Sequence, residues 1–297
     1  MNKNYYLGID GGGTKTAIVI IDEDNQIVYN NVLGPSSLDT VPLIEIEKMF
    51  IEESKKIPFK VSSVFAGLGG ISSQKDIENI NNILAKMSCV LPNAKVSSDN
   101  DVVNALYGAL DGQDGIVIIA GTGSVAFGKW NEKYARSGGY CYQEGDAGSA
   151  YYIGYRALQH LARVCDGRKE RSSFSDSLMK EIDCYDYQSL AHYFIHATRT
   201  EIASLAPLVC SSNNPEALKI VVDAVDEIIE MIKAVHKRLA INSESCPFSI
   251  IGSLGNNNEL YRKLLFEKLI VLNPKIKYQY KKYDASFGAA LKARSLQ

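Results

Sequence analysis

The segment LGIDGGGTKT, residues 7–16, separates two short apolar runs near the start of the chain. Its three consecutive glycines remove every Cβ from a tight turn, so backbone amides there can approach an anion closely. The run that follows, residues 17–21, is rich in β-branched residues and therefore predicts a second strand, not a helix. Rossmann and Walker A loops both lead into a helix, so this segment predicts a different device, a strand–hairpin–strand unit.

This hairpin carries the groups that a nucleotide phosphate and its cation require. Its amides and hydroxyls suit phosphate, and Asp10 offers a carboxylate to the Mg²⁺ that accompanies ATP. The phosphate-binding candidates are Gly11, Gly12, Gly13, Thr14, Lys15 and Thr16. The alternative is an ordinary β-hairpin whose glycines only satisfy a turn, because short motifs often match by chance.

The composition is that of an ordinary globular protein, and its 297 residues are enough for two domains. A net charge of -2 provides no basic surface for nucleic acid and no polybasic patch for a membrane. The N-terminus lacks a long apolar segment, so we expect no signal peptide and a cytoplasmic location. The six cysteines form no CxxC pair, which argues against zinc and against a disulfide framework and favours buried thiols.

The first half of the chain predicts a mixed sheet with helices on its faces, in the order βββαβα. Ser73 and Asp76 have the spacing of a capping box, which predicts a helix start. The expected strands are residues 5–9, 17–21, 26–33, 61–68 and 94–98, and the expected helices are 43–56, the segment after Ser73, and 102–110.

The second half begins as the first does, with an apolar strand at 115–120, a Gly/Thr turn at 121–124 and a return strand at 125–128. This internal echo predicts a duplicated domain that faces its copy across a cleft, with two phosphate hairpins on opposite walls. The glycine-rich segment 137–149 is expected to be a loop before a helix that ends near Cys165, with Asp146 or Ser149 as its N-cap. Beyond it we expect helical structure over 170–215, helices at 218–239, 258–271 and 284–294, and strands at 248–251 and 276–280.

Six segments in this order resemble the actin-like ATPase and sugar kinase superfamily, and within it the N-acetylglucosamine kinase family with the related BadF/BadG ATPases. They are GIDGGGTKT (8–16), DNDVVNALYGAL (99–110), IIAGTGS (118–124), SGGYCYQEGDAGSAYYIG (137–154), IIGSLG (250–255) and FGAALKA (287–293). The resemblance implies an α/β fold of two actin-like (ribonuclease H-like) domains, each with a mixed five-stranded sheet. The implied domains are residues 1–115, completed by the helix 285–297, and residues 116–284.

The resemblance also implies roles for individual residues. Asp10 with the first hairpin, and Gly121, Thr122, Gly123 and Ser124 in the second, would bind ATP phosphates and Mg²⁺, and Gly252 and Ser253 would hold adenosine. Asp101 would be the catalytic base. The implied sugar-side residues are Ser36, Ser37, Asp101, Thr122, Gly139, Tyr140, Gly145 and Asp146. Two positions depart from the family pattern on this side, since Ala147 stands where an acid is frequent and Ser37 replaces a common asparagine.

Without the resemblance, the role of Asp101 stays open between two acids and two functions. Asp99 and Asp101 both follow a predicted strand, and two residues apart on an extended segment they share a face. Either carboxylate could take a proton from an acceptor hydroxyl during phosphoryl transfer. Asp101 also begins a predicted helix, so it could serve only as the N-cap.

The resemblance implies ATP- and Mg²⁺-dependent phosphorylation of an amino sugar, N-acetylglucosamine, at the C6 hydroxyl, by a cytoplasmic homodimer. The alternatives are an N-acetylmuramic acid or glucosamine kinase or, from another class, an activator ATPase of the BadF type. The latter requires cysteines that bridge an iron–sulfur cluster, and this chain has no cysteine pair in a glycine-rich loop. A sugar sensor without activity would fit only if the base were lost. The four histidines are expected to have surface or packing roles.

Overall fold

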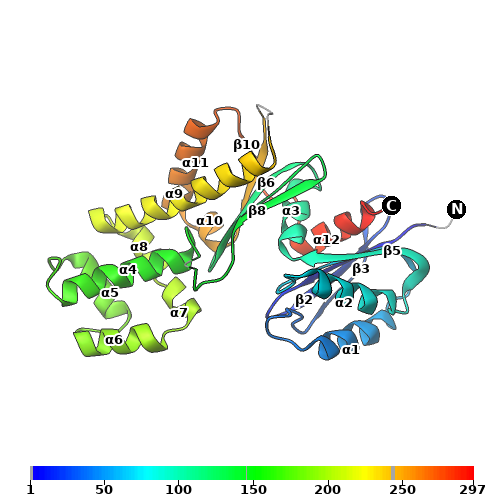
Figure 1. The fold of residues 1–297 in the computed structure, drawn as a ribbon, viewed down its shortest axis with the longest axis horizontal. Helices are drawn as coiled ribbons and strands as arrows, with labels where there is room; N and C mark the ends of the chain where they lie inside the picture. Colours follow the sequence, from blue (N-terminus) through cyan, green and yellow to red (C-terminus); the bar gives the residue numbers. More distant parts are fainter. Residues whose placement is uncertain (1–2, 145, 242–244) are drawn as a thin grey trace. The chain divides into compact units, whose positions relative to one another are not determined.

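A computed structural model describes residues 3–144, 146–241 and 245–297 (Figure 1). The chain forms two compact units. The first contains the residues up to Gln113 together with Tyr280–Gln297, and the second contains Asp114–Gln279. The first unit is therefore built from both ends of the chain.

The first unit is a five-stranded sheet with helices on both faces. Its strands lie in the order β3-β2-β1-β4-β5, with β1 antiparallel to β2 and parallel to β4. Leu7 and Ile9 share a hydrophobic cluster with residues of α1 and α2, whereas Gly8 faces the backbone of α12 on the opposite side. The elements are β1 (Tyr6–Gly11), β2 (Thr16–Ile21), β3 (Ile27–Leu33), α1 (Leu43–Ser54), β4 (Val61–Leu68), α2 (Gln74–Ala85), β5 (Val90–Asn100), α3 (Val102–Leu110) and α12 (Ala285–Arg294).

The second unit repeats this sheet. Its strands lie in the order β10-β9-β6-β7-β8. As in the first sheet, the first three strands in sequence are antiparallel to one another, and the last two, β9 and β10, are added in parallel beside the first of them. The strands are β6 (Gly115–Ala120), β7 (Ser124–Trp130), β8 (Lys133–Gly138), β9 (Pro247–Ile251) and β10 (Lys277–Tyr278). The predicted fold class, two mixed five-stranded α/β sheets, is confirmed.

The helices of the second unit lie mainly between β8 and β9 in the sequence (Figure 1). The 24-residue helix α9 buries the apolar face that its periodicity predicts. The full set is α4 (Ala150–Cys165), α5 (Ser173–Glu181), α6 (Tyr187–His196), α7 (Arg199–Ala203), α8 (Ala206–Ser211), α9 (Pro215–Arg238), α10 (Ser253–Asn257) and α11 (Glu259–Leu272). Among the described residues, no helix has the length and apolarity needed to cross a membrane.

Two of the predicted helix caps are present, and the edge strands differ from their predicted lengths. The capping box of Ser73 and Asp76 is confirmed at the start of α2, and Ser149 is the N-cap of α4, accepting from Tyr152 N at 3.1 Å. Strand β8 was not predicted, and its last two residues fall in the segment that was expected to be a loop. The strand predicted at 276–280 is reduced to two residues, whereas β5 is longer than expected.

Candidate active site

Three parallel strands of the first unit end side by side at the same sheet edge. The register pairs Gly11 of β1 with Leu68 of β4, and Leu68 with Asn100 of β5. Asp10 and Asp101 lie immediately beside these ends in the sequence. The topology therefore gathers both predicted acids at one edge, as parallel strands do at many ligand sites.

The first hairpin is a tight, well-braced turn. Gly12 N–H donates to Lys15 O at 3.0 Å, and Gly12 O accepts from the backbone amides of Ser36 and Ser37 at 3.1 and 3.2 Å. A Cβ on Gly11 would lie 2.0 Å from Ser36 Oγ, so this position requires glycine. Gly13, Thr14 and Lys15 are exposed at the tip, where a ligand can reach them.

Two of the predicted ligand residues instead hold the loops together. Thr16 and Ser36 are completely buried, and Thr16 Oγ1 lies 2.7 Å from both Ser36 Oγ and Gly34 O. Their hydroxyls therefore join the first hairpin to the loop after β3. Ser37 is also buried and accepts from Asp39 N–H at 3.4 Å.

Asp10 lies in an environment that favours a bound cation. Burial raises the pKa of its carboxyl to about 6, Asn104 opposes this by a hydrogen bond, and Asp101 adds to it by charge repulsion. Asn104 Nδ2 donates to Asp10 Oδ1 at 2.7 Å and to Gly67 O at 2.9 Å. Within the described ranges, three or more His, Cys, Asp or Glu side chains nowhere form a cluster that could hold a metal. One partly buried carboxylate fits Mg²⁺, which usually takes one or two carboxylates and completes its shell with phosphates and water.

Asp101 occupies the N-cap position of α3, but its side chain makes no capping hydrogen bond. A Cβ on Gly69 would lie 3.0 Å from Ser37 Oγ and 3.7 Å from Asp101 Oδ2, so these two side chains flank the same glycine. Asp99 differs, because it is exposed and its Oδ1 accepts from the adjacent Asn100 N–H at 2.7 Å. Of the two acids, Asp101 is the one near Asp10 and Ser37.

The second hairpin is braced by the start of α4. Ala150 N–H and Tyr151 N–H donate to the carbonyls of Gly121 and Thr122 at 2.9 and 3.2 Å. Ser124 is buried, and its hydroxyl donates to Ala147 O at 2.5 Å, which joins the hairpin to the glycine-rich segment. Of this turn, Thr122 lines a pocket of the second unit, and a Cβ on Gly121 would lie 3.8 Å from Ser253 Oγ.

Asp146 is paired with an arginine that the sequence did not suggest. Its carboxylate is 2% exposed and lies 2.5 Å from Arg199 Nη2. Burial raises the pKa of Asp146, and the positive charge of Arg199 opposes the rise. A Cβ on Gly123 would lie 2.2 Å from Arg199 Nη2 and 3.0 Å from Asp146 Oδ1, so the pair adjoins the second hairpin.

The remaining sugar-side predictions lie in the segment after β8. Gly139 has a φ of 68°, and Tyr140 is 82% exposed. Gly145 lies outside the described residues. Among the described residues, no hydrogen bond or ring contact joins Tyr140 to Asp146, so the structure does not bring these two residues together.

A cavity of about 420 Å³ connects the second hairpin to the predicted adenosine segment within the second unit. Gly252 has a φ of 99°, and a Cβ there would lie 2.4 Å from Ala120 O, so only glycine lets α10 begin beside the hairpin. The opposite wall comes from α7 and α8, whose contribution the sequence did not indicate. The lining residues are Thr122, Ala150, Thr200, Ala203, Ser204, Ala206, Pro207, Ser253, Leu254, Asn257 and Asn258.

The chain resembles known proteins over nearly its whole length. The model of the BadF/BadG/BcrA/BcrD ATPase family matches residues 7–293. The chain belongs to this family. It is 30% identical over 306 residues to an N-acetylmuramic acid/N-acetylglucosamine kinase of Clostridium acetobutylicum, covering 98% of each chain. It is 27% identical over 319 residues to an N-acetyl-D-glucosamine kinase of Dictyostelium discoideum, covering 99% of this chain and 98% of the relative.

The fold of the chain is also similar to that of solved structures. A candidate N-acetylglucosamine kinase from Chromobacterium violaceum superposes with a TM-score of 0.71 at 24% identity, covering 97% of this chain and 98% of the other. At this identity the superposition supports the two-domain fold and not a substrate.

Proposed function

We propose that this family member is an ATP-dependent kinase that phosphorylates an amino sugar, N-acetylglucosamine, at its C6 hydroxyl. The observation that carries the proposal is the position of the Asp101 carboxylate, which flanks Gly69 together with Ser37 and lies close enough to Asp10 to raise the pKa of Asp10 by charge repulsion. A carboxylate in that position suits a general base for an acceptor hydroxyl.

ATP use is supported by the second unit. The cavity between Thr122 and Ser253 has the size of small-molecule sites, and Asn257 and Asn258 offer amide groups for a nucleoside. Thr122 at one end belongs to the glycine-rich hairpin, whose amides suit phosphates. In the first unit, the exposed tip of the first hairpin, Gly13 to Lys15, also has amides and a hydroxyl that suit phosphate.

Phosphoryl transfer would require different roles of Asp101 and Asp10. Phosphoryl transfer depends on positioning and on neutralising phosphate charge, with little covalent work for the protein. Asp101 would accept the proton of the acceptor hydroxyl as its oxygen attacks. Asp10, oriented by Asn104, would hold Mg²⁺, which when bound supplies charge neutralisation at the phosphates.

The amino sugar class is supported by the two kinases named above, which act on N-acetylglucosamine or on both it and N-acetylmuramic acid. The alternative substrates are N-acetylmuramic acid and glucosamine. Ser37 and Ala147, the two departures from the family pattern, lie at the Asp101 edge and beside Asp146 respectively, so they are the positions to vary in a specificity study.

The alternative activity, an activator ATPase with an iron–sulfur cluster, has less support. All six cysteines lie in the described ranges, where four are buried and only Cys141 is exposed. Burial raises the pKa of Cys89, Cys210 and Cys246, which disfavours the thiolate that ligates iron.

A coupled ADP-release assay tests the proposal. N-acetylglucosamine, N-acetylmuramic acid, glucosamine and glucose would each be added with ATP and Mg²⁺, and iron would be measured in the same preparation. We expect the highest kcat/KM with N-acetylglucosamine and no stoichiometric iron. ADP release that is independent of every sugar, together with bound iron, would favour the activator.

A further inference from the structure

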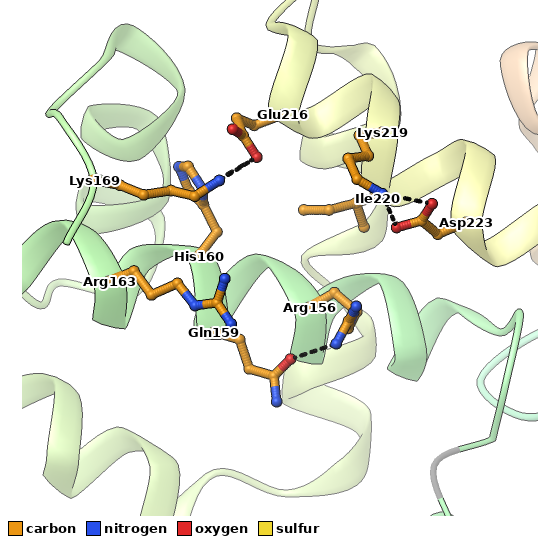
Figure 2. A pocket seen from close by; sticks show the side chains of 9 residues that line it. All are labelled: Arg156, Gln159, His160, Arg163, Lys169, Glu216, Lys219, Ile220 and Asp223. Atoms are coloured by element: carbon orange, nitrogen blue, oxygen red, sulfur yellow. Dashed lines mark hydrogen bonds and ion pairs between the residues drawn. The ribbon is translucent and has the colours of Figure 1, made fainter.

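The second unit contains another pocket, distant in sequence from the glycine-rich loops. It lies between the C-terminal half of α4 and the first turns of α9 and has a volume of about 120 Å³ (Figure 2). Its lining residues are Arg156, Gln159, His160, Arg163, Lys169, Glu216, Lys219, Ile220 and Asp223. Nothing in the proposed kinase mechanism uses them.

His160 is the unusual group in this pocket. Its side chain is 7% exposed, and neither Nδ1 nor Nε2 has a hydrogen-bond partner. The nearest carboxylate oxygen, Glu216 Oε2, is 3.9 Å from Nδ1, which is too far for a hydrogen bond. Buried polar groups are nearly always paired in native proteins, so this imidazole has hydrogen-bonding capacity that a ligand or a water molecule in the pocket would satisfy.

The charges around His160 leave a positive excess. Four cationic side chains and two carboxylates line the pocket, for a net charge of +2. Both carboxylates are already paired, Glu216 with Lys169 at 2.6 Å and Asp223 with Lys219 at 2.8 Å (Figure 2). Arg156 bonds only to the neutral Gln159 in this pocket, and Arg163 makes no ion pair with a carboxylate that lines it.

We propose that this pocket binds a phosphate group as its dianion, with His160 as a hydrogen-bond donor and Arg163 as a counter-charge. A phosphate monoester carries close to two negative charges at neutral pH, which matches the excess. The cavity is smaller than sites that enclose whole small molecules, so it would take the phosphate and leave any attached group outside. The source can be free inorganic phosphate or a sugar phosphate.

The site is separate from the proposed nucleotide pocket. The first turn of α4 bonds to the second hairpin, whereas His160 lies ten residues further along the same helix. At 1.5 Å per residue this corresponds to about 15 Å along the helix axis. The proposal therefore does not depend on the kinase assignment, and it can be tested without nucleotide or sugar acceptor.

Histidine-ring NMR gives a direct readout. The chain has four histidines, and only His160 lines this pocket. The protein would be labelled with ¹⁵N-histidine and titrated with inorganic phosphate or with glucose 6-phosphate, at ionic strength matched with sodium chloride. The His160 signals would be assigned by their loss in His160→Gln.

Arg163→Gln and Arg168→Gln form a matched pair, because both remove one exposed arginine and only Arg163 lines the pocket. We expect saturable shifts of the His160 signals with at least one probe, binding at least tenfold weaker in Arg163→Gln, and unchanged binding in Arg168→Gln. The probe that binds more tightly identifies the source. His160 signals that stay fixed with both probes, or equal binding by the two arginine variants, would overturn the proposal.

Discussion

Asp101 has two possible roles that a single substitution separates. Asn keeps the size of the side chain and can still cap a helix, but it cannot accept the substrate proton. We predict that Asp101→Asn lowers kcat about 10²–10⁴-fold, the usual range for a general base, while KM for the sugar changes far less. Steady-state kinetics of ADP release would measure both constants.

The matched control is Asp99→Asn, which changes the exposed acid two residues earlier. Its kcat should stay within a few-fold of the wild-type value. If Asp99→Asn loses activity and Asp101→Asn retains it, the roles of the two acids are reversed.

The ionisation of Asp10 should make the stability of the fold depend on pH. Because burial raises its folded-state pKa to about 6 from 3.8, the cost of ionising Asp10 in the fold begins above about pH 4, grows until about pH 6 and is constant above that pH. Asp10→Asn, which keeps an acceptor for Asn104, should therefore be more stable than wild type by up to about 3 kcal/mol at pH 7.5 and by about 1 kcal/mol at pH 4.5.

Urea unfolding without nucleotide or Mg²⁺ at the two pH values measures this difference. Asp99→Asn, at the same sheet edge but exposed, should show a much smaller stabilisation. An Asp10→Asn variant that is no more stable than wild type at pH 7.5 would show that the burial of this carboxylate carries no cost.

The residues of the candidate site differ in how far the sequence could predict them. Asp10, Asp99 and Asp101 were candidates because they stand at predicted strand ends, and the choice of Asp101 over Asp99 came from the resemblance. Asn104 was missed, although it is the one polar residue inside the otherwise apolar helix α3, and this contrast was an available signal. Arg199 had no such signal, because its partner Asp146 is 53 residues away and nothing local links the two.

At the scale of elements, the first hairpin offers the clearest test of phosphate binding. A Cβ on Gly12 would meet only Lys15 O, at an ordinary 3.8 Å, so a side chain there should not disturb the fold. We predict that Gly12→Val weakens ATP binding by at least about tenfold, because it blocks the approach of phosphate to the turn. Calorimetric titration with ATP would measure the affinity.

Gly34→Val is the matched control, since its Cβ would also meet one atom, Met49 Sδ, at 3.8 Å. Its ATP affinity should be unchanged. Equal affinity in the Gly12 variant would mean that the glycines only form a turn. Gly123 gives a less specific test, because a side chain there would also break the pair of Arg199 and Asp146.

Strand β8, which was not predicted, and strand β10, which was predicted too long, both lie at sheet edges. Strand β8 lies at a sheet edge and buries only Ala135 fully, so it lacks an alternating apolar pattern. Strand β10 lies at the opposite edge and pairs over two residues, which hydrophobicity alone does not specify. The central strands β1, β4 and β6 were predicted well because they are largely buried and mostly apolar.

At the scale of the whole molecule, the strand order repeats in both units, and the echo of strand, Gly/Thr turn and strand was its sequence signal. The return of the chain to the first unit is explained by close packing. A Cβ on Gly8 would lie 2.1 Å from Ala290 N, and Ser63 Oγ donates to Ala293 O at 2.6 Å. Helix α12 therefore packs directly on one face of the first sheet. The sequence showed the small residues of α12, while its place in the first unit came from the resemblance.

The position of the transferred phosphate on the sugar distinguishes a C6 kinase from the alternative activities. The protein would be incubated with ATP, Mg²⁺ and N-acetylglucosamine, and the product examined by two-dimensional ¹H–³¹P NMR. We predict one sugar phosphate whose phosphorus couples to the two C6 methylene protons, and at least about 100-fold less of it with Asp101→Asn over the same time, while wild-type product still accumulates linearly. Coupling to the anomeric proton, or ADP and free phosphate without any sugar phosphate, would contradict the account.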